Sequence, residues 1–357
     1  MTTMSSNERV LSALAHVEPD RIPINYSANP GIDGRLKAHF GLRRDDDAGL
    51  RQILGVDFLG IHAPYVGPQL HADVPGRQVD IWGVRTRYVE HQSGGYWDFC
   101  DFPLQSATAE QIAGWPLPDP EDFDIGSIAE RCRANRKYCL YAGHAGWGCV
   151  INRIGKLVGM EQVLMDLATD NPATLHLISR KQTIELELLA RTLEAGRGYF
   201  DFVWLGEDMS TQLGPLISPR LYRKHIKPWH AQFVSLAKAF DLPVMFHSCG
   251  ACSWAFEDLI EIGVAAVDTL QPEAAGMDAL TLKGAYGDQL AFHGAITTGG
   301  AIAYGTPDEV AAECRRVLQI MMPGGGYCFA PSHQLQDNTP TTNAIAMYET
   351  AQAFGIY

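Results

Sequence analysis

The sequence predicts an α/β protein built as a (β/α)8 TIM barrel. Short apolar runs that suit buried strands alternate with segments of helical periodicity along most of the 357 residues. Eight such runs occur, which is the strand number of this barrel. No Gly-x-Gly-x-x-Gly follows the first run, which disfavours the competing doubly wound sheet. No repeat, low-complexity tract or linker divides the chain, so we expect one barrel domain over residues 1–357.

The expected strands are four to six residues long and rich in apolar residues. They lie at residues 22–26, 57–62, 138–142, 200–205, 243–246, 265–270, 290–293 and 326–330. Between the second and third strands the pattern changes to aromatic and polar residues in alternation, on both sides of Gly94-Gly95. This alternation predicts a β-hairpin inserted near residues 79–102, which decorates the barrel rather than forming part of it.

Helices are expected between these strands from apolar periodicity and from capping signals. They are predicted at residues 7–17, 35–40, 49–54, 125–136, 150–195 with a break near 171–172, from 218 onward, 253–262, 278–286, from 306 onward and from 339 onward. Thr306-Pro307-Asp308-Glu309 is the clearest start, because it combines a capping box with proline at the first helical position. Thr108 to Gln111 is a second capping box, for a short helix.

Composition excludes several classes of protein. The net charge of -13 argues against nucleic acid or an anionic membrane as the main partner. There is no run of eighteen apolar residues, and the polar N-terminus has no signal-peptide core, so we expect a cytoplasmic protein. The eight cysteines lack the spacing of a disulfide framework and are expected to be reduced thiols.

The run 243–246 ends on His247-Ser-Cys249-Gly250. His247 and Cys249 are two positions apart, so their side chains point the same way if the strand continues. An imidazole beside a thiolate is a good pair of zinc ligands. The alternative is a hydrogen-bonded histidine next to a buried free cysteine. The position at the carboxyl end of a strand, where barrel active sites lie, favours the metal site.

A catalytic zinc site needs at least one more protein ligand. His333 lies just beyond the last expected strand and is the favoured third ligand. Cys328 is softer but lies inside that strand, where packing is the simpler interpretation, and Cys252 begins a helix. Glu207 or Glu273 would suit a fourth, displaceable position.

Several motifs give the chain a resemblance to a known superfamily. They are Pro19-Asp20-Arg21-Ile22-Pro23, Asp80-Ile-Trp-Gly-Val84, Gln212 to Pro219 with Tyr222 and Ile226-Lys227-Pro228, His247-Ser-Cys-Gly250, Gln271-Pro-Glu-Ala-Ala-Gly-Met-Asp278, and Gly324 to His333. On these residues the chain resembles the uroporphyrinogen decarboxylase superfamily, in particular its cobalamin-associated methyltransferase branch. The resemblance covers nearly the whole chain and implies a (β/α)8 barrel, in agreement with the strand count.

The resemblance also implies a cofactor and a partner. That branch holds Zn2+ with a His-x-Cys pair and a distant third ligand, usually cysteine, where this chain has His333. It implies methyl transfer between a small methylated substrate, or a thiol or pterin acceptor, and a corrinoid. The chain has no Asp-x-His-x-x-Gly signature, so the corrinoid is expected on a separate protein. A homodimer is compatible with the resemblance.

The remaining site residues are predicted from their places after the strands. The expected catalytic groups, which orient the substrate or move its proton, are Glu207, Asp208 and Glu273. The expected substrate ligands are Asn25, His144, Tyr222 and Gln271. For these residues a helix cap or a supporting hydrogen bond is the alternative.

Two other functions remain open at this point. One is a metal-free decarboxylase of the uroporphyrinogen decarboxylase type, which requires basic residues to grip carboxylates. The loop after the first strand has no arginine before Arg35, which speaks against it. The other is a barrel without catalytic activity that binds a corrinoid protein.

Overall fold

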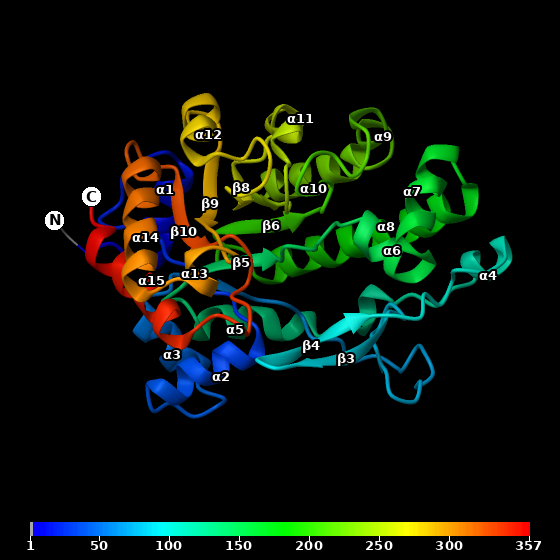
Figure 1. Ribbon diagram of the computed structural model, residues 1–357. Helices are drawn as coiled ribbons and strands as arrows, with labels where there is room; N and C mark the ends of the chain where they lie inside the picture. The colour runs from blue at the N-terminus through cyan, green and yellow to red at the C-terminus, as the bar shows by residue number, and fades with distance from the viewer. Residues whose placement is uncertain (1–2) are drawn as a thin grey trace.

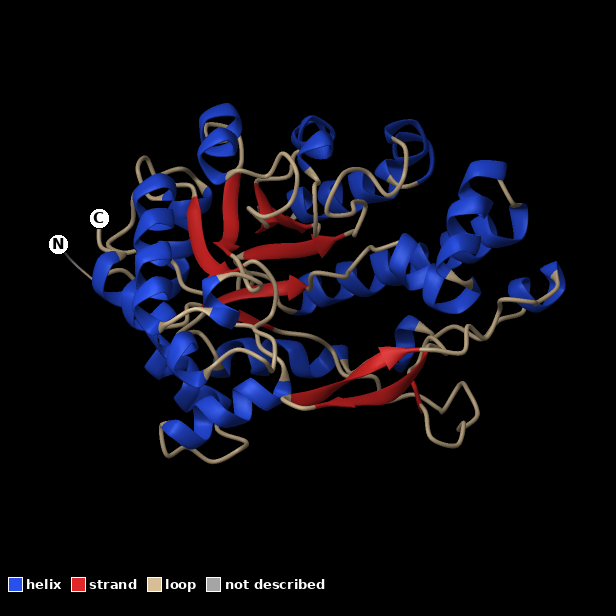
Figure 2. Ribbon diagram, viewed as in Figure 1, coloured by secondary structure: helices blue, strands red, loops and turns tan. Residues whose placement is uncertain are grey.

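The computed structural model describes residues 3–357; Met1 and Thr2, part of the polar N-terminus, lie outside the described residues. Seven strands form one parallel sheet that curls around a central axis, with helices on its outer side (Figures 1 and 2). In sheet order they are β1 (Phe58–Gly60), β5 (Cys139–Gly143), β6 (Phe202–Gly206), β7 (Val244–His247), β8 (Ala266–Leu270), β9 (Ala291–Ile296) and β10 (Tyr327–Pro331). The α/β barrel class and seven of the eight expected strands are confirmed.

The first expected strand is an extended segment that lies between the two edges of this sheet. On one side Asn25 N donates to Phe329 O at 2.9 Å, and Phe329 N donates to Pro23 O at 2.8 Å. On the other side Asp57 N donates to Ile24 O at 2.8 Å. Pro23 has no N–H, which limits the hydrogen bonds that a full strand would make. The segment thus closes the barrel without forming a regular strand.

Side chains alternate between the barrel interior and the surrounding helices, as strand geometry requires. In β6, Phe202 and Trp204 pack in the interior cluster, whereas Val203 and Leu205 belong to the outer core beneath the helices. Helix α1 (Ser6–Leu14) adds Val10, Ala13 and Leu14 to the interior cluster. This helix therefore plugs the amino-terminal end of the barrel and leaves the carboxyl end for ligands.

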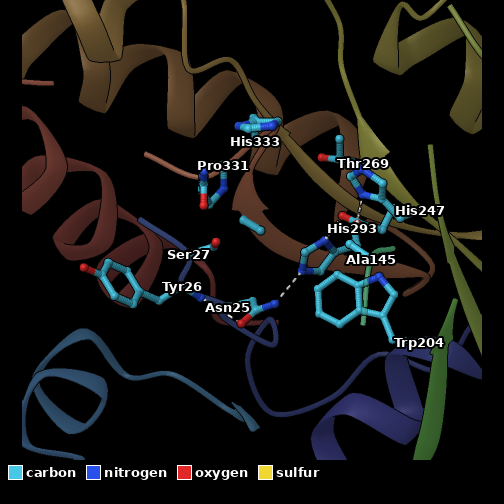
Figure 3. A pocket seen from close by; sticks show the side chains of 13 residues that line it. Asn25, Tyr26, Ser27, Ala145, Trp204, His247, Thr269, His293, Pro331 and His333 are labelled. Atoms are coloured by element: carbon cyan, nitrogen blue, oxygen red, sulfur yellow. Dashed lines mark hydrogen bonds and ion pairs between the residues drawn. The ribbon is translucent and has the colours of Figure 1, made fainter. Parts of the chain in front are cut away.

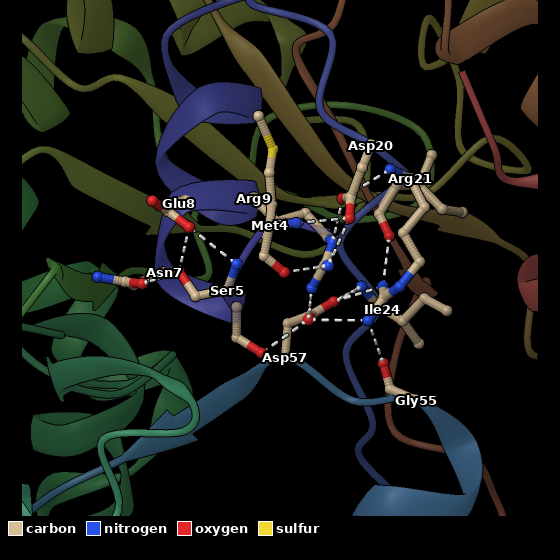
Figure 4. Close-up of polar contacts among 12 residues, drawn as sticks. Met4, Ser5, Asn7, Glu8, Arg9, Asp20, Arg21, Ile24, Gly55 and Asp57 are labelled. Carbon is tan, nitrogen blue, oxygen red and sulfur yellow. Dashed lines mark hydrogen bonds and ion pairs between the residues drawn. The ribbon is translucent and has the colours of Figure 1, made fainter. Parts of the chain in front are cut away.

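Buried ion pairs hold helix α1 in place (Figure 4). Arg9 contacts Asp57 at 2.6 Å and Asp20 at 2.7 Å. Arg21 contacts the other oxygen of Asp57 at 2.7 Å, and Ile24 N donates to the same carboxylate at 2.9 Å. The motif around Asp20-Arg21 therefore joins the plug to the closing segment. Breaking the Arg9–Asp57 pair, which is buried on both sides, should cost about 3–5 kcal/mol.

The helices follow the expected order with local differences. They are α2 (Pro30–His39), α3 (Asp47–Leu54), α4 (Ala109–Ala113), α5 (Ile128–Ala134), α6 (Ile151–Val158), α7 (Met160–Thr169), α8 (Pro172–Ala195), α9 (Pro219–His225), α10 (Lys227–Ala239), α11 (Phe256–Ile262), α12 (Ala279–Tyr286), α13 (Ala301–Tyr304), α14 (Pro307–Met321) and α15 (Thr341–Phe354). The expected helix 150–195 also breaks at Gly159, whose φ of 107° is not helical. No helix among residues 3–357 is both long and apolar enough to cross a membrane.

The predicted hairpin is present as β3 (Arg85–His91) and β4 (Gly94–Phe99), with β2 (Gln78–Val79) as a third strand. Its turn is at residues 92–93, so the expectation that Gly94-Gly95 forms the turn is wrong; both glycines lie in β4. Gly94 has a φ of 153°, and a Cβ there would meet the Asp337 carboxylate at 2.3 Å. Glycine is required because the hairpin tip lies against the loop that follows β10.

Candidate functional site

Asp208, His247 and Cys249 come together at the carboxyl end of the barrel. One ligand atom from each lies within 4.8 Å of the others, and among the described residues they form the one such group of three. His247 Nε2 lies 3.3 Å from Cys249 Sγ and 3.6 Å from Asp208 Oδ1. The group forms because β6 and β7 are neighbours, with Gly206 paired to His247, so the residues that follow each strand meet.

The turn after β7 is held by the same carboxylate. Cys249 N donates to Asp208 Oδ1 at 3.0 Å, and Asn152 Nδ2 donates to Asp208 Oδ2 at 2.7 Å. Gly250 has a φ of 78°, and a Cβ there would meet Thr211 O at 2.4 Å. The glycine of the His-Ser-Cys-Gly motif is therefore a backbone requirement that keeps the cysteine facing the histidine.

Asp268, in β8, bridges two histidines. His247 Nδ1 lies 2.5 Å from one carboxylate oxygen, and His293 Nδ1 lies 2.6 Å from the other. Asn25 Nδ2 is 3.0 Å from His293 Nε2, while Asn25 Oδ1 accepts from Tyr26 N at 2.8 Å (Figure 3). The Asn25 amide nitrogen is fixed as a donor to His293 Nε2, so His293 carries its proton on Nδ1. This Nδ1–H donates a hydrogen bond to Asp268. The other oxygen of the Asp268 carboxylate accepts a hydrogen bond from His247 Nδ1. Nε2 of His247 therefore faces Cys249 and Asp208, where it can bind a ligand.

Charges in this network depend on one another. Burial disfavours a charge on His247, but Asp268, Cys249 and Asp208 outweigh it and raise the pKa of His247 well above its usual value. Burial would raise the pKa values of the two carboxyl groups, but His247 outweighs it, so the pKa of Asp208 and that of Asp268 are lowered. These interactions hold a proton on both nitrogens of His247, and a metal ion that binds Nε2 must displace the proton there, which leaves the Nδ1 tautomer that Asp268 selects.

A pocket of about 270 Å3 opens above the network at the carboxyl ends of the strands (Figure 3). Its walls include Asn25, Trp204, His247, Asp268, Thr269, His293 and His333. None of the described residues that line it is a lysine or an arginine. Its volume is slightly below the range of about 300–1,000 Å3 for pockets that enclose drug-sized ligands. The pocket therefore suits a small ligand.

The structure brings some of the predicted residues into this pocket and not others. His333 lines it and is exposed, with Nδ1 at 3.2 Å from Gln336 Nε2, but it is not within the group of three ligand atoms. Cys328 is fully buried in the barrel interior with Met245 and Phe58, which agrees with the packing interpretation. The assignment of His333 as a metal ligand stays a prediction.

Glu207 and Tyr222 lie in the protein core. Glu207 accepts from Val150 N at 2.6 Å and Ile151 N at 3.1 Å, so it caps the start of α6. Burial raises the pKa of Glu207 to about 7. Tyr222 is fully buried, and its hydroxyl lies 3.3 Å from His230 Nδ1. Neither side chain lines the pocket, and their predicted roles in catalysis and substrate binding remain untested.

The other predicted residues lie on loops beside the site. Gln271 Oε1 accepts from Gly250 N at 2.8 Å, and Gln271 Nε2 donates to the exposed Glu273 at 3.2 Å. His144 Nδ1 accepts from Gly146 N at 3.0 Å, and burial lowers the pKa of His144 to about 3. Gln271 therefore supports the turn that carries the cysteine, and His144 stays neutral.

The sequence interpretation missed Asp268, which links the two histidines. Its signal is a charged residue in the middle of an otherwise apolar strand, Ala266-Val-Asp-Thr-Leu270. A charged side chain that is 4% exposed needs partners, which here are two imidazoles from neighbouring strands.

Comparison with known proteins adds a family and a fold. The family described as Uroporphyrinogen decarboxylase (URO-D) matches residues 110–354, which is more than half of the chain. Among solved structures, a methyltransferase from Methanosarcina mazei superposes with a TM-score of 0.69 over 98% of this chain and 99% of that chain. The two sequences are 16% identical, so this likeness concerns the fold. No curated protein sequence matches the chain significantly.

Proposed function

The chain belongs to the uroporphyrinogen decarboxylase family, and we propose that it is a zinc-dependent methyltransferase of that family. It moves a methyl group between a small methylated substrate, or a thiol or pterin acceptor, and a corrinoid on a separate protein. The observation that carries this proposal is the meeting of Asp208, His247 and Cys249 beside a pocket at the carboxyl end of the barrel. The fold shared with a methyltransferase supports it.

The donor set fits zinc. An imidazole nitrogen, a thiolate and a carboxylate oxygen are ligands of this ion in proteins. His247 is held through Nδ1 by Asp268, the arrangement in which a carboxylate orients a zinc-binding histidine. His247 and Cys249 are the shared ligands, and the third is Asp208 in the observed geometry or His333 in the sequence pattern. Zinc would act as a Lewis acid on the heteroatom that gains or loses the methyl group.

The protein side chains have their own roles in this proposal. Asp208 holds the turn through Cys249 N and so keeps the thiol beside the imidazole. The Asn25–His293–Asp268 chain fixes the tautomer of His247. Trp204 forms an apolar wall that excludes water from the reacting group.

The pocket supports methyl transfer more than decarboxylation. Decarboxylation of a tetrapyrrole requires cationic groups for several carboxylates, and no described lining residue is a lysine or an arginine. A cavity of about 270 Å3 is also small for a tetrapyrrole.

The test is the metal content of protein purified without added metal, followed by methyl transfer to reduced cobalamin from small methyl ethers and methylated amines. We expect about one zinc per chain and zinc-dependent formation of methylcobalamin. Cys249→Ala should lose both, whereas Cys252→Ala, which changes a fully buried cysteine in the next turn, should keep both. Protein that binds no zinc, either as purified or on titration, would refute the proposal.

A further inference from the structure

The two carboxylate oxygens of Asp208 have different neighbours. Oδ1 accepts a hydrogen bond from Cys249 N at 3.0 Å, and it is the oxygen nearer to His247 Nε2, at 3.6 Å. Oδ2 accepts from Asn152 Nδ2 at 2.7 Å. An ionised carboxylate only accepts hydrogen bonds, so the amide nitrogen of Asn152 is the atom that faces it. The carboxylate is therefore held with one oxygen toward the candidate metal group and the other toward α6.

Helix α6, which carries Asn152, is attached to the same strand end a second time. Glu207 directly precedes Asp208, and its fully buried carboxylate accepts from Val150 N at 2.6 Å and Ile151 N at 3.1 Å. Residues 207 and 208 thus bind the backbone and a side chain at the start of one helix. Because α6 cannot shift without breaking both sets of contacts, Asn152 keeps its place beside Asp208.

The number of oxygens that Asp208 offers decides whether a metal site here stays open. His247, Cys249 and one oxygen of Asp208 are three protein ligands, and they leave the fourth tetrahedral position for a substrate. A carboxylate that binds through both oxygens would compete with the substrate for that position. An ion at Oδ2 would have to displace the hydrogen bond from Asn152, which is strengthened by the carboxylate charge.

We propose that Asn152 is a positioning residue that makes Asp208 a metal ligand through Oδ1 alone and so keeps one coordination position open for the substrate. Asn152 acts through Asp208, by the hydrogen bond to Oδ2. The number of coordinating oxygens rests on the proposed function. The orientation of Asp208 does not, because its hydrogen bonds to Asn152 and Cys249 require no metal.

Hydrogen exchange at the Cys249 amide tests this orientation in metal-free protein. The protein is labelled with 15N at its eight cysteines, and the Cys249 signal is the one missing from labelled Cys249→Ala. Asn152→Leu removes the donor at similar side-chain volume, so Asp208 is no longer fixed toward Cys249 N. We expect the Cys249 amide to exchange about tenfold faster in this variant. An unchanged exchange rate overturns the proposal.

Asn171 offers a matched control. It also donates through Nδ2 to a carboxylate, that of Asp166, at 3.0 Å, but it does so between α7 and α8. Asn171→Leu should keep the wild-type exchange rate at Cys249. If it accelerates exchange as much as Asn152→Leu, the effect is general destabilisation and the positioning role is wrong.

A second variant covers the case in which Asn152→Leu does not fold. Asn152→Asp keeps the shape of the side chain and replaces the amide donor with a carboxylate that repels Asp208. It should accelerate exchange at the Cys249 amide in the same way. Wild-type exchange in folded Asn152→Asp overturns the proposal.

The visible absorption of protein loaded with Co2+ in place of zinc tests the number of coordinating oxygens. Four-coordinate Co2+ absorbs visible light more strongly than five-coordinate Co2+, so coordination number is read from intensity. In Asn152→Leu, where Asp208 can bind through both oxygens, we expect the absorption to fall about twofold. Asn171→Leu should keep the wild-type spectrum. Identical spectra in wild type and Asn152→Leu overturn the single-oxygen assignment.

The two measurements separate this proposal from the proposed function. Wild-type protein that binds neither Zn2+ nor Co2+ refutes the proposed function and the open coordination position, while amide exchange still decides whether Asn152 orients Asp208. Wild-type protein that binds zinc, with exchange and spectrum unchanged in Asn152→Leu, overturns the role of Asn152 alone. Neither measurement needs a corrinoid protein or turnover.

Discussion

Asp268 binds Nδ1 of His247 at 2.5 Å and so turns Nε2 of the same imidazole toward Cys249 and Asp208. Without this contact the imidazole would not be held beside the Cys249 thiol. The carboxylate makes the histidine a better ligand in two ways: it fixes which nitrogen is free, and it adds negative charge behind the ring.

Replacing that carboxylate should therefore weaken metal binding without removing a ligand. In Asp268→Asn, we expect the zinc dissociation constant to rise about 10- to 100-fold, measured by competition with a coloured chelator. Asp201→Asn is the control, because Asp201 is also buried and accepts from Leu140 N, but it precedes β6 at the opposite end of the barrel. An unchanged dissociation constant in Asp268→Asn would show that the histidine needs no support.

Substitutions of Cys249 and Cys328 should separate metal binding from packing. Cys249→Ala should abolish zinc binding and leave the far-ultraviolet circular dichroism unchanged. Cys328→Ala should keep the metal and lower the free energy of unfolding by about 1 kcal/mol, because a fully buried sulfur is lost from the barrel interior. The reverse pattern, with metal lost only in Cys328→Ala, would move the third ligand into the barrel interior.

The identity of the third zinc ligand follows from comparing Asp208→Asn with His333→Ala. In the observed geometry Asp208 is within reach of His247 and Cys249, so Asp208→Asn should reduce zinc affinity more than His333→Ala. Isothermal titration with zinc measures both. A larger loss in His333→Ala would mean that the exposed loop after β10 moves inward when the ion binds.

The ion pair of Asp20 makes a testable contribution to stability. Burial opposes charge on Asp20, but the hydrogen bonds from Arg9 and Met4 N outweigh it and lower the pKa of Asp20 to about 2. A lowered carboxyl pKa stabilises the folded state above the unfolded-state pKa of about 4, and the gain disappears as the pH falls through 2. Allowing for solvent screening, Asp20→Asn should cost about 1 kcal/mol at pH 7.

Urea denaturation of wild type and Asp20→Asn at pH 7 and at pH 3 measures this contribution. The difference between the two proteins should shrink to roughly half at pH 3. Asp45→Asn is the control, since the Arg43–Asp45 pair is exposed on both sides and should contribute almost nothing at either pH. A difference that does not change with pH would mean that Asp20 acts through packing rather than charge.

Much of the fold was predictable because its signals are local. Strands appear as short apolar runs, and both predicted capping boxes, at Thr108 and Thr306, are present. The hairpin turn was misplaced because Gly94 satisfies a tertiary contact with Asp337 rather than the turn itself. The first strand was expected to be regular. Pro23 makes it irregular because proline has no backbone N–H to donate to a neighbouring strand. The cost of that missing donor depends on which strand lies beside Pro23, and the local sequence does not say.

The site was predictable only in part. His247 and Cys249 are two positions apart in the sequence, and this spacing indicates a metal pair. Asp208 was expected at the site, but as a group acting on the substrate; its contact with the pair depends on which strands are neighbours. The role of Asp268 depends on contacts across β7, β8 and β9, which periodicity does not reveal.

The closing segment also has a consequence for how the chain is made. Asn25 and Pro23 pair with Phe329, so residues from the two ends of the chain form the last seam of the barrel. A nascent polypeptide emerging from the ribosome cannot form that seam until β10 has been synthesised. Its early strands must wait with an open edge, which is where unpaired strands recruit other chains. We expect truncated products that lack β10 to be captured by chaperones or to aggregate.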